Sequence, residues 1–262
     1  MRIPELIAHR GYAAHFPENT LPALEAAVAA GARLVEIDVQ LSADGVPVLF
    51  HDQGLRRVCG VSGSLHRRRY SELQALSAHE PARLGKRFVG TPLVSLARFR
   101  RFLEENPGVT AFVEAKPAAV RHFGVDRMLD AIAGALQPVA PRSVLISSSV
   151  PLLRAARDRT AGGLEPLGWH ALGGVIERWR QRWALSELRP EYLFCAVRGL
   201  PRNGEIRFPP ARIAVYEITS ASLAVALRRR GVDLIETFAI AELGRDLQRF
   251  AHSVVDSGGD GQ

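Results

Sequence analysis

Short apolar segments alternate with longer amphipathic segments along most of the chain. The short segments are rich in Val, Ile and Leu and predict strands, whereas the longer ones repeat apolar residues at helical spacing. The predicted strands are residues 6–10, 33–40, 46–52, 110–116, 143–149, 163–169, 191–196, 212–219 and 233–238, and the predicted helices are residues 19–31, 95–106, 124–136, 150–159, 173–188, 220–231 and 240–251. This order predicts an α/β protein built from repeated strand–helix units.

About eight such units in roughly 250 residues favour a (β/α)8 TIM barrel. Residues 46–50 could form an extra hairpin arm, and residues 53–92 break the alternation, so we interpret them as a small insertion after the second barrel strand region. We expect a single catalytic barrel domain over residues 1–252 and a disordered tail at 253–262. A doubly wound sheet is the alternative, but the segment HRGYAAHFPENT after the first strand lacks the GxGxxG pattern typical of that fold.

Two acidic residues stand inside the apolar segment LVEIDVQ, residues 34–40. Because strand side chains alternate between two faces, Glu36 and Asp38 share one face and the intervening valines and isoleucine share the other. In a barrel the apolar face packs against the helices, so both carboxylates should point into the barrel near the carboxyl end of the strand. Two anions this close repel each other unless one binds a proton or a cation lies between them.

The ends of other predicted strands carry similar side chains. Glu114 and Lys116 share a face near the end of residues 110–116, His9 lies near the end of the first strand, and His51 near the end of the strand at 46–52. The carboxyl ends of the strands form the edge where barrel enzymes place their chemistry. Three carboxylates suit a hard divalent cation such as Mg²⁺ or Ca²⁺, and two histidines suit proton transfer near neutral pH.

Arg10 and Lys116 add positive charge to the same edge. The planar guanidinium of Arg10 can bind phosphate oxygens in pairs, and the ammonium of Lys116 supplies a point charge. A metal ion, two acid–base groups and phosphate-binding cations together predict cleavage of a phosphodiester. The structural alternative is that Glu114 is only the ion-pair partner of Lys116 and that the histidines only satisfy local hydrogen bonds.

Composition adds little to this picture. The chain of 262 residues has a net charge of +7, a pI near 10.2 and 47% apolar residues. Its arginines are scattered, and no nucleic-acid motif accompanies the clusters at 66–70 and 228–230, so a compositional bias explains the charge better than nucleic-acid binding. Cys59 and Cys195 match no metal spacing. With neither a secretory signal nor an apolar run of membrane length, we expect a cytoplasmic protein with reduced cysteines.

The N-terminal motifs resemble those of a known family. Residues 8–52, AHRGYAAHFPENTLPALEAAVAAGARLVEIDVQLSADGVPVLFHD, closely resemble the signature of the glycerophosphodiester phosphodiesterase family, with its HRG, PENT, ExD and HD motifs in order. FVEAKP at 112–117 and GVDLIETFAIAEL at 231–243 are similar to later family segments.

The resemblance implies a TIM barrel with an insertion at about 53–92. It also implies hydrolysis of a glycerophosphodiester to sn-glycerol 3-phosphate and an alcohol. Carried over by position, it implies a general acid–base pair of His9 and His51, one Mg²⁺ or Ca²⁺ held by Glu36, Asp38 and Glu114, and phosphate contacts from Arg10 and Lys116.

Two departures from the family pattern concern the substrate pocket. The family usually has Trp-Thr-Val-Asn where this chain has VYEIT, with Tyr216 in the aromatic position, and Thr-Asp where it has Thr237 and Phe238. The leaving alcohol, the choice of metal, the roles of the two histidines and the oligomeric state stay open. One alternative function is a phospholipase D-like enzyme acting on lysophospholipids or sphingomyelin, and another is a non-catalytic module that binds a phosphate ligand or nucleic acid.

Overall fold

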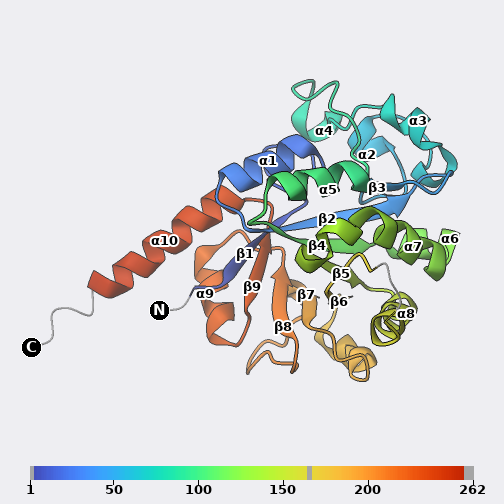
Figure 1. The fold of residues 1–262 in the computed structure, drawn as a ribbon. Helices are drawn as coiled ribbons and strands as arrows, with labels where there is room; N and C mark the ends of the chain where they lie inside the picture. Colours follow the sequence, from blue (N-terminus) through green and yellow to red (C-terminus); the bar gives the residue numbers. More distant parts are fainter. Residues whose placement is uncertain (1–2, 164–166, 257–262) are drawn as a thin grey trace, which may run out of the picture.

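The computed structural model describes residues 3–163 and 167–256. Eight parallel strands close into a barrel surrounded by helices (Figure 1), in the order β1-β2-β4-β5-β6-β7-β8-β9, with β9 pairing back to β1. The barrel strands are β1 (Glu5–His9), β2 (Leu34–Leu41), β4 (Thr110–Ala115), β5 (Ser143–Ser147), β6 (Ala171–Ile176), β7 (Tyr192–Ala196), β8 (Arg212–Tyr216) and β9 (Leu234–Thr237). The predicted TIM barrel is confirmed.

Helices cover the outside of the barrel between successive strands. The α-helices on the barrel are α1 (Leu21–Ala29), α5 (Leu96–Glu105), α6 (Pro117–Phe123), α7 (Val125–Leu136), α8 (Val150–Ala161), α9 (Ala221–Arg229) and α10 (Ile240–Asp256), and the 3₁₀ turns are η2 (Gln137–Arg142), η3 (Trp179–Leu185) and η4 (Val197–Gly199). Helix α1 begins after Thr20, whose hydroxyl accepts a hydrogen bond from the Ala23 amide at 3.4 Å. Gly31 follows the helix at φ 92°, a conformation that favours glycine.

The strand β3 (Pro47–Leu49) pairs antiparallel with β2 and forms the expected hairpin arm outside the barrel. The segment 53–92 follows it with α2 (Arg56–Cys59), η1 (Leu65–Arg67), α3 (Tyr70–Gln74) and α4 (Pro81–Leu84), which lie beside β3 at one side of the barrel (Figure 1). This segment has a small apolar core of its own, centred on Phe50, Leu55, Leu65 and Leu73. The predicted insertion therefore packs as a compact addition.

One predicted strand and one predicted helix are wrong. The strand expected at 163–169 is not formed where the chain is described, while residues 164–166 lie outside the described part. Instead β6 covers 171–176, so the first residues of the helix expected at 173–188 belong to the barrel, and a short 3₁₀ turn replaces the rest. The physical reason is packing: a Cβ on Gly173 would lie 2.7 Å from Ile146, and one on Gly174 would collide with Leu185. The two glycines allow Ile146 and Leu185 to lie close to the backbone of β6. Because glycine has a low strand propensity, the local sequence does not indicate this strand.

The interior of the barrel is apolar along most of the strands and charged at their carboxyl ends. Eight side chains pack inside it: Ile7, Phe112, Val144, Ile146, Ala171, Phe194, Ala214 and Leu234. Above them, at the carboxyl ends of the strands, the inward positions become acidic and basic. The barrel therefore has a polar opening at the carboxyl ends of its strands, called the mouth below, and an apolar interior beneath it.

The C-terminal helix extends further than predicted. Helix α10 runs to Asp256, so residues 253–256 of the expected disordered tail are helical, and residues 257–262 lie outside the described part. Among the described helices, none is both long enough and apolar enough to span a membrane. Cys59 and Cys195 are both buried free thiols. The cytoplasmic location stays a prediction.

Candidate active site

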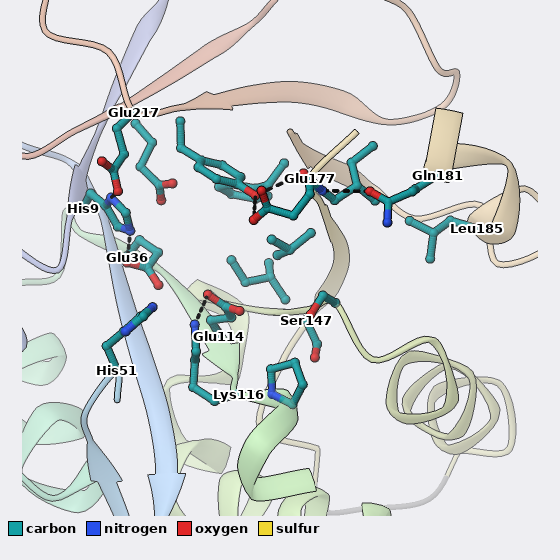
Figure 2. A pocket seen from close by; sticks show the side chains of 18 of the residues that line it. His9, Glu36, His51, Glu114, Lys116, Ser147, Glu177, Gln181, Leu185 and Glu217 are labelled. Carbon is teal, nitrogen blue, oxygen red and sulfur yellow. Dashed lines mark hydrogen bonds and ion pairs between the residues drawn. The ribbon is translucent and has the colours of Figure 1, made fainter. Parts of the chain in front are cut away.

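A cavity of about 750 Å³ opens at the carboxyl ends of the barrel strands. Six of the seven site residues predicted from sequence line it, namely His9, Arg10, Glu36, His51, Glu114 and Lys116. The seventh, Asp38, is fully buried directly beneath them. Figure 2 shows His9, Glu36 and His51 on one side of the cavity, with Glu177, Gln181 and Leu185 across from them.

The three predicted carboxylates converge. Glu36, Asp38 and Glu114 each place one oxygen within 4.8 Å of the others. The strand register explains this closeness, because Asp38 and Glu114 are direct partners between β2 and β4, while Glu36 precedes Asp38 by one inward position. The geometric expectation that three acids from separate parts of the chain meet at the mouth is confirmed.

Arg10 and Lys116 hold Asp38 between them. Lys116 Nζ lies 3.1 Å from both Asp38 and Glu114, and Arg10 Nε lies 3.0 Å from Asp38. Asn19 also donates to Asp38 at 2.8 Å. Burial alone would raise the pKa of Asp38, but Arg10 and Lys116 outweigh it and hold the pKa well below its usual range. Asp38 is thus a fixed anion at the base of the cavity.

Glu36 and Glu114 are in a different electrostatic situation. Burial, then repulsion from Asp38 and Glu236, raises the pKa of Glu36 well above its ordinary value. Burial also raises the pKa of Glu114, although Lys116 counteracts it. Oε1 of Glu36 is buried and has no hydrogen-bond partner among the described residues. A hard divalent cation would satisfy this oxygen and relieve the repulsion, so the oxygen-only donor set fits Mg²⁺ or Ca²⁺.

His51 lies at the lip of the cavity and is backed by a carboxylate. Its Nδ1 lies 2.7 Å from Asp52 Oδ1, which leaves Nε2 for the cavity. Arg57 of α2 donates to both oxygens of Asp52, at 2.7 and 3.0 Å, and also pairs with buried Glu18 at 2.7 Å. Glu18 in turn accepts from Arg10 at 3.2 Å. Arg57 of the insertion therefore holds Asp52 in place, and Asp52 in turn fixes the orientation of His51.

His9 is buried deeper and its ring is clamped. Phe238 stacks on the imidazole with 4.5 Å between ring centroids and an interplanar angle of 6°. Nε2 of His9 lies 3.6 Å from Glu36, and Nδ1 lies 3.4 Å from Glu217. Burial and the nearby Arg10 lower the pKa of His9 well below its ordinary value, so the imidazole is neutral at physiological pH.

Sequence reasoning missed Glu217 and Glu236, which both line the cavity. Glu236 lies inside β9 and faces inward, because its register partner on β1 is the inward-facing Ile7. The same period-two alternation that identified Glu36 applies to residues 234–238 and could have found it. Glu217 directly follows the last residue of β8, a position that a search of strand ends would have included.

Comparisons with known sequences agree with these observations. A family model described as "Glycerophosphoryl diester phosphodiesterase family" matches residues 9–153. The chain is 40% identical over 74 residues to the uncharacterized protein YqiK of Bacillus subtilis, a match that spans 28% of this chain and 30% of that protein. It is 28% identical over 209 residues to a glycerophosphodiester phosphodiesterase of Caldanaerobacter subterraneus, covering 78% of this chain and 84% of that protein.

Solved structures show the same fold. A phosphodiesterase of Oleispira antarctica superposes with a TM-score of 0.78 at 23% identity, covering 94% of this chain and 97% of that one. A glycerophosphodiester phosphodiesterase of Parabacteroides distasonis gives a TM-score of 0.69 at 22% identity, covering 94% and 98%.

Proposed function

The chain belongs to the glycerophosphoryl diester phosphodiesterase family, and on that premise we propose that it hydrolyses glycerophosphodiesters to sn-glycerol 3-phosphate and an alcohol. The observation that carries the proposal is the meeting of two histidines, three carboxylates and two cations around one cavity. The solved structure of the similar Oleispira antarctica phosphodiesterase holds the product sn-glycerol-3-phosphate. This complex supports the same product for the present chain.

A divalent cation belongs to this proposal. Glu36, Asp38 and Glu114 would hold Mg²⁺ or Ca²⁺ through their oxygens. Bound there, the ion would supply charge neutralisation for the phosphoryl oxygens. Lys116 and Arg10 line the same cavity and contribute positive charge toward the diester, while their ion pairs with Asp38 hold them in place.

The two histidines divide the proton transfers. The neutral, buried His9 takes the proton of the attacking hydroxyl, which belongs either to water or to the glycerol moiety of the substrate. The phosphorus–oxygen bond to the leaving alcohol then breaks, and His51 donates a proton to the departing oxygen. Attack by water gives sn-glycerol 3-phosphate directly, whereas attack by the glycerol hydroxyl gives a cyclic phosphate, which a water molecule then opens to the same product as the two histidines exchange roles. Asp52, 2.7 Å from Nδ1, orients the His51 ring with Nε2 toward the cavity for that proton donation. The different surroundings of the two rings support this division of roles.

A hydrolysis assay tests the proposal. The purified protein is incubated with glycerophosphocholine or glycerophosphoethanolamine in Mg²⁺, in Ca²⁺ and in excess EDTA, and release of sn-glycerol 3-phosphate is followed. We expect release with at least one of the two ions and none with EDTA. Activity that survives complete removal of metal would contradict the cation's role, and absence of release under every condition would contradict the hydrolase itself.

A second substrate class has one specific observation in its favour. Part of the cavity wall is apolar, with Ile146, Val175, Leu185 and Phe194 beside the polar Glu177 and Gln181, and Trp183 on the adjoining turn η3 is 63% exposed. Such a wall suits an acyl chain as well as a small alcohol. Lysophosphatidylcholine is therefore included in the same assay, and faster hydrolysis of it than of glycerophosphocholine would select the lysophospholipase D-like alternative.

A further inference from the structure

A second group of ligand atoms lies beside the three predicted carboxylates. His9, Glu36 and Glu236 each place one nitrogen or oxygen within 4.8 Å of the others, and all three side chains are buried. The group shares Glu36 with the first set but contains neither Asp38 nor Glu114. Its members come from β1, β2 and β9, which are neighbours in the barrel, with His9 opposite Glu36 in the strand register.

The charges of this group lack a counterion. Asp38 and Glu114 have Lys116 at 3.1 Å, but neither Glu36 nor Glu236 makes an ion pair with a lysine or arginine side chain in the part of the chain that is described. Oε1 of Glu36 and Oε1 of Glu236 are both buried without a hydrogen-bond partner there. Buried carboxylate oxygens without partners are costly and rare. A cation between these two glutamates would satisfy both oxygens and take the place of the protons that they otherwise tend to bind.

His9 is held in the manner of a metal-ligating histidine. Its Nε2 faces Glu36 at 3.6 Å, and its Nδ1 lies 3.4 Å from the Glu217 carboxylate, to which it makes no hydrogen bond. Metal-binding histidines commonly direct one ring nitrogen to the ion and the other to a carboxylate that fixes the ring. The stacked Phe238 fixes the plane of the imidazole as well.

We propose that His9, Glu36 and Glu236 form a second cation site, distinct from the oxygen-only site. One imidazole nitrogen and two carboxylates suit a transition-metal dication such as Zn²⁺ or Mn²⁺ better than Mg²⁺ or Ca²⁺. An ion on Nε2 of His9 occupies the lone pair that would accept a proton during hydrolysis. Occupation of the second site therefore stops turnover, and this consequence, unlike the binding itself, rests on the proposed function.

Counting bound ions tests the site without reference to activity. Metal-free protein is titrated with Mn²⁺, and free Mn²⁺ is followed by electron paramagnetic resonance. We expect two ions per chain in the wild type and one in Glu236→Gln, which keeps the side-chain volume. The matched control is Glu177→Gln on the opposite side of the cavity, where the glutamate pairs with Arg198 at 2.7 Å, and it should still bind two ions. One ion in the wild type, or two in Glu236→Gln, would overturn the proposal.

Two further measurements guard against a variant that fails to fold. Crystals of the wild type soaked in Zn²⁺ should show an anomalous peak between His9, Glu36 and Glu236, and a bound Zn²⁺ found only elsewhere would refute the site. With Mg²⁺ saturating, Zn²⁺ should inhibit hydrolysis by the wild type. When each protein's rate is normalised to its own rate without Zn²⁺, the half-inhibitory Zn²⁺ concentration of Glu236→Gln should be at least about tenfold higher than that of the wild type. Two bound Mn²⁺ ions together with no hydrolysis in Mg²⁺ or Ca²⁺ alone would refute only the proposed function, whereas hydrolysis in Mg²⁺ together with a single bound Mn²⁺ ion would refute only the second site.

Discussion

Replacing Asp52 with asparagine tests how the HD motif supports catalysis. Asp52 accepts hydrogen bonds from His51 at 2.7 Å and from Arg57 at 2.7 and 3.0 Å. Asparagine keeps the volume but removes the carboxylate that contacts Nδ1 of His51 and orients the ring, and its amide can turn an N–H toward the ring. We expect kcat to fall by about 10²–10⁴-fold, the usual contribution of a positioned general acid, while KM stays close to that of the wild type.

The same substitution has a calculable effect on stability. Burial raises the pKa of Asp52, but hydrogen bonds from Arg57 and His51 outweigh it and lower the pKa from its ordinary 3.8 to about 2. At about 1.4 kcal/mol per pKa unit, the paired carboxylate adds about 2 kcal/mol to the free energy of unfolding near neutral pH. The side chain is 29% exposed, so screening by solvent reduces this to about 1 kcal/mol. Because the folded-state pKa lies below the unfolded one, the contribution is complete well above pH 4 and disappears as the pH falls toward about 2.

Urea unfolding and steady-state kinetics on the same preparations check both effects. The gap in the free energy of unfolding between wild type and Asp52→Asn should be about 1 kcal/mol at about pH 7 and narrower at about pH 3. Asp130→Asn is the matched control, because Asp130 pairs with Arg159 at 2.6 Å on the outer helices, far from the cavity lining. It should leave kcat unchanged. A wild-type kcat for Asp52→Asn would refute the reasoning about His51.

Four other substitutions give sharp expectations. His9→Asn and His51→Asn should each lower kcat by about 10²–10⁴-fold with the melting temperature preserved, and near-normal turnover in either would remove that residue from the mechanism. Glu36→Gln should weaken Mg²⁺ binding measured by calorimetry at least about tenfold, so an unchanged affinity would place the ion elsewhere. Gly173→Ala should lower the free energy of unfolding by about 1–3 kcal/mol because its Cβ would lie 2.7 Å from Ile146 Cγ2 and 3.2 Å from Tyr192 Cβ, whereas Gly134→Ala, where space is open, should not; equal effects would contradict the packing argument.

Most of the predicted site was accessible from sequence because it depends on local geometry. The alternation of side chains in LVEIDVQ determines that Glu36 and Asp38 face the same way, whatever the rest of the chain does. The barrel then determines that they face inward. What the local pattern does not contain is the register between strands, which places Asp38 directly beside Glu114. Their convergence could be expected from the fold class, but their direct pairing could not.

The errors also have physical causes. Gly173 and Gly174 have low strand propensity, yet the backbone of β6 must pass close to Leu185 and Ile146, and only glycine leaves room. A tertiary requirement therefore overrides the local signal. Glu236 was missed because it is a single acid in an otherwise apolar strand, although the alternation that identified Glu36 applies there as well. Phe238 gains its meaning only from its contact with His9, which lies more than 200 residues earlier in the chain.

The charge balance of the mouth links the fold to the proposed chemistry. Around the two candidate cation sites, four carboxylates face two cations, namely Glu36, Asp38, Glu114 and Glu236 against Arg10 and Lys116, while Glu177, Glu217 and Arg198 line the rest of the cavity. Burial and mutual repulsion raise the pKa values of the three glutamates at the two sites, so without a metal ion these groups tend to bind protons. Binding of a cation at the mouth is therefore coupled to the release of protons from these glutamates. The same excess of negative charge would repel a phosphodiester, so a dication both makes the closeness of the carboxylates tolerable and turns the cavity into a site that attracts an anion.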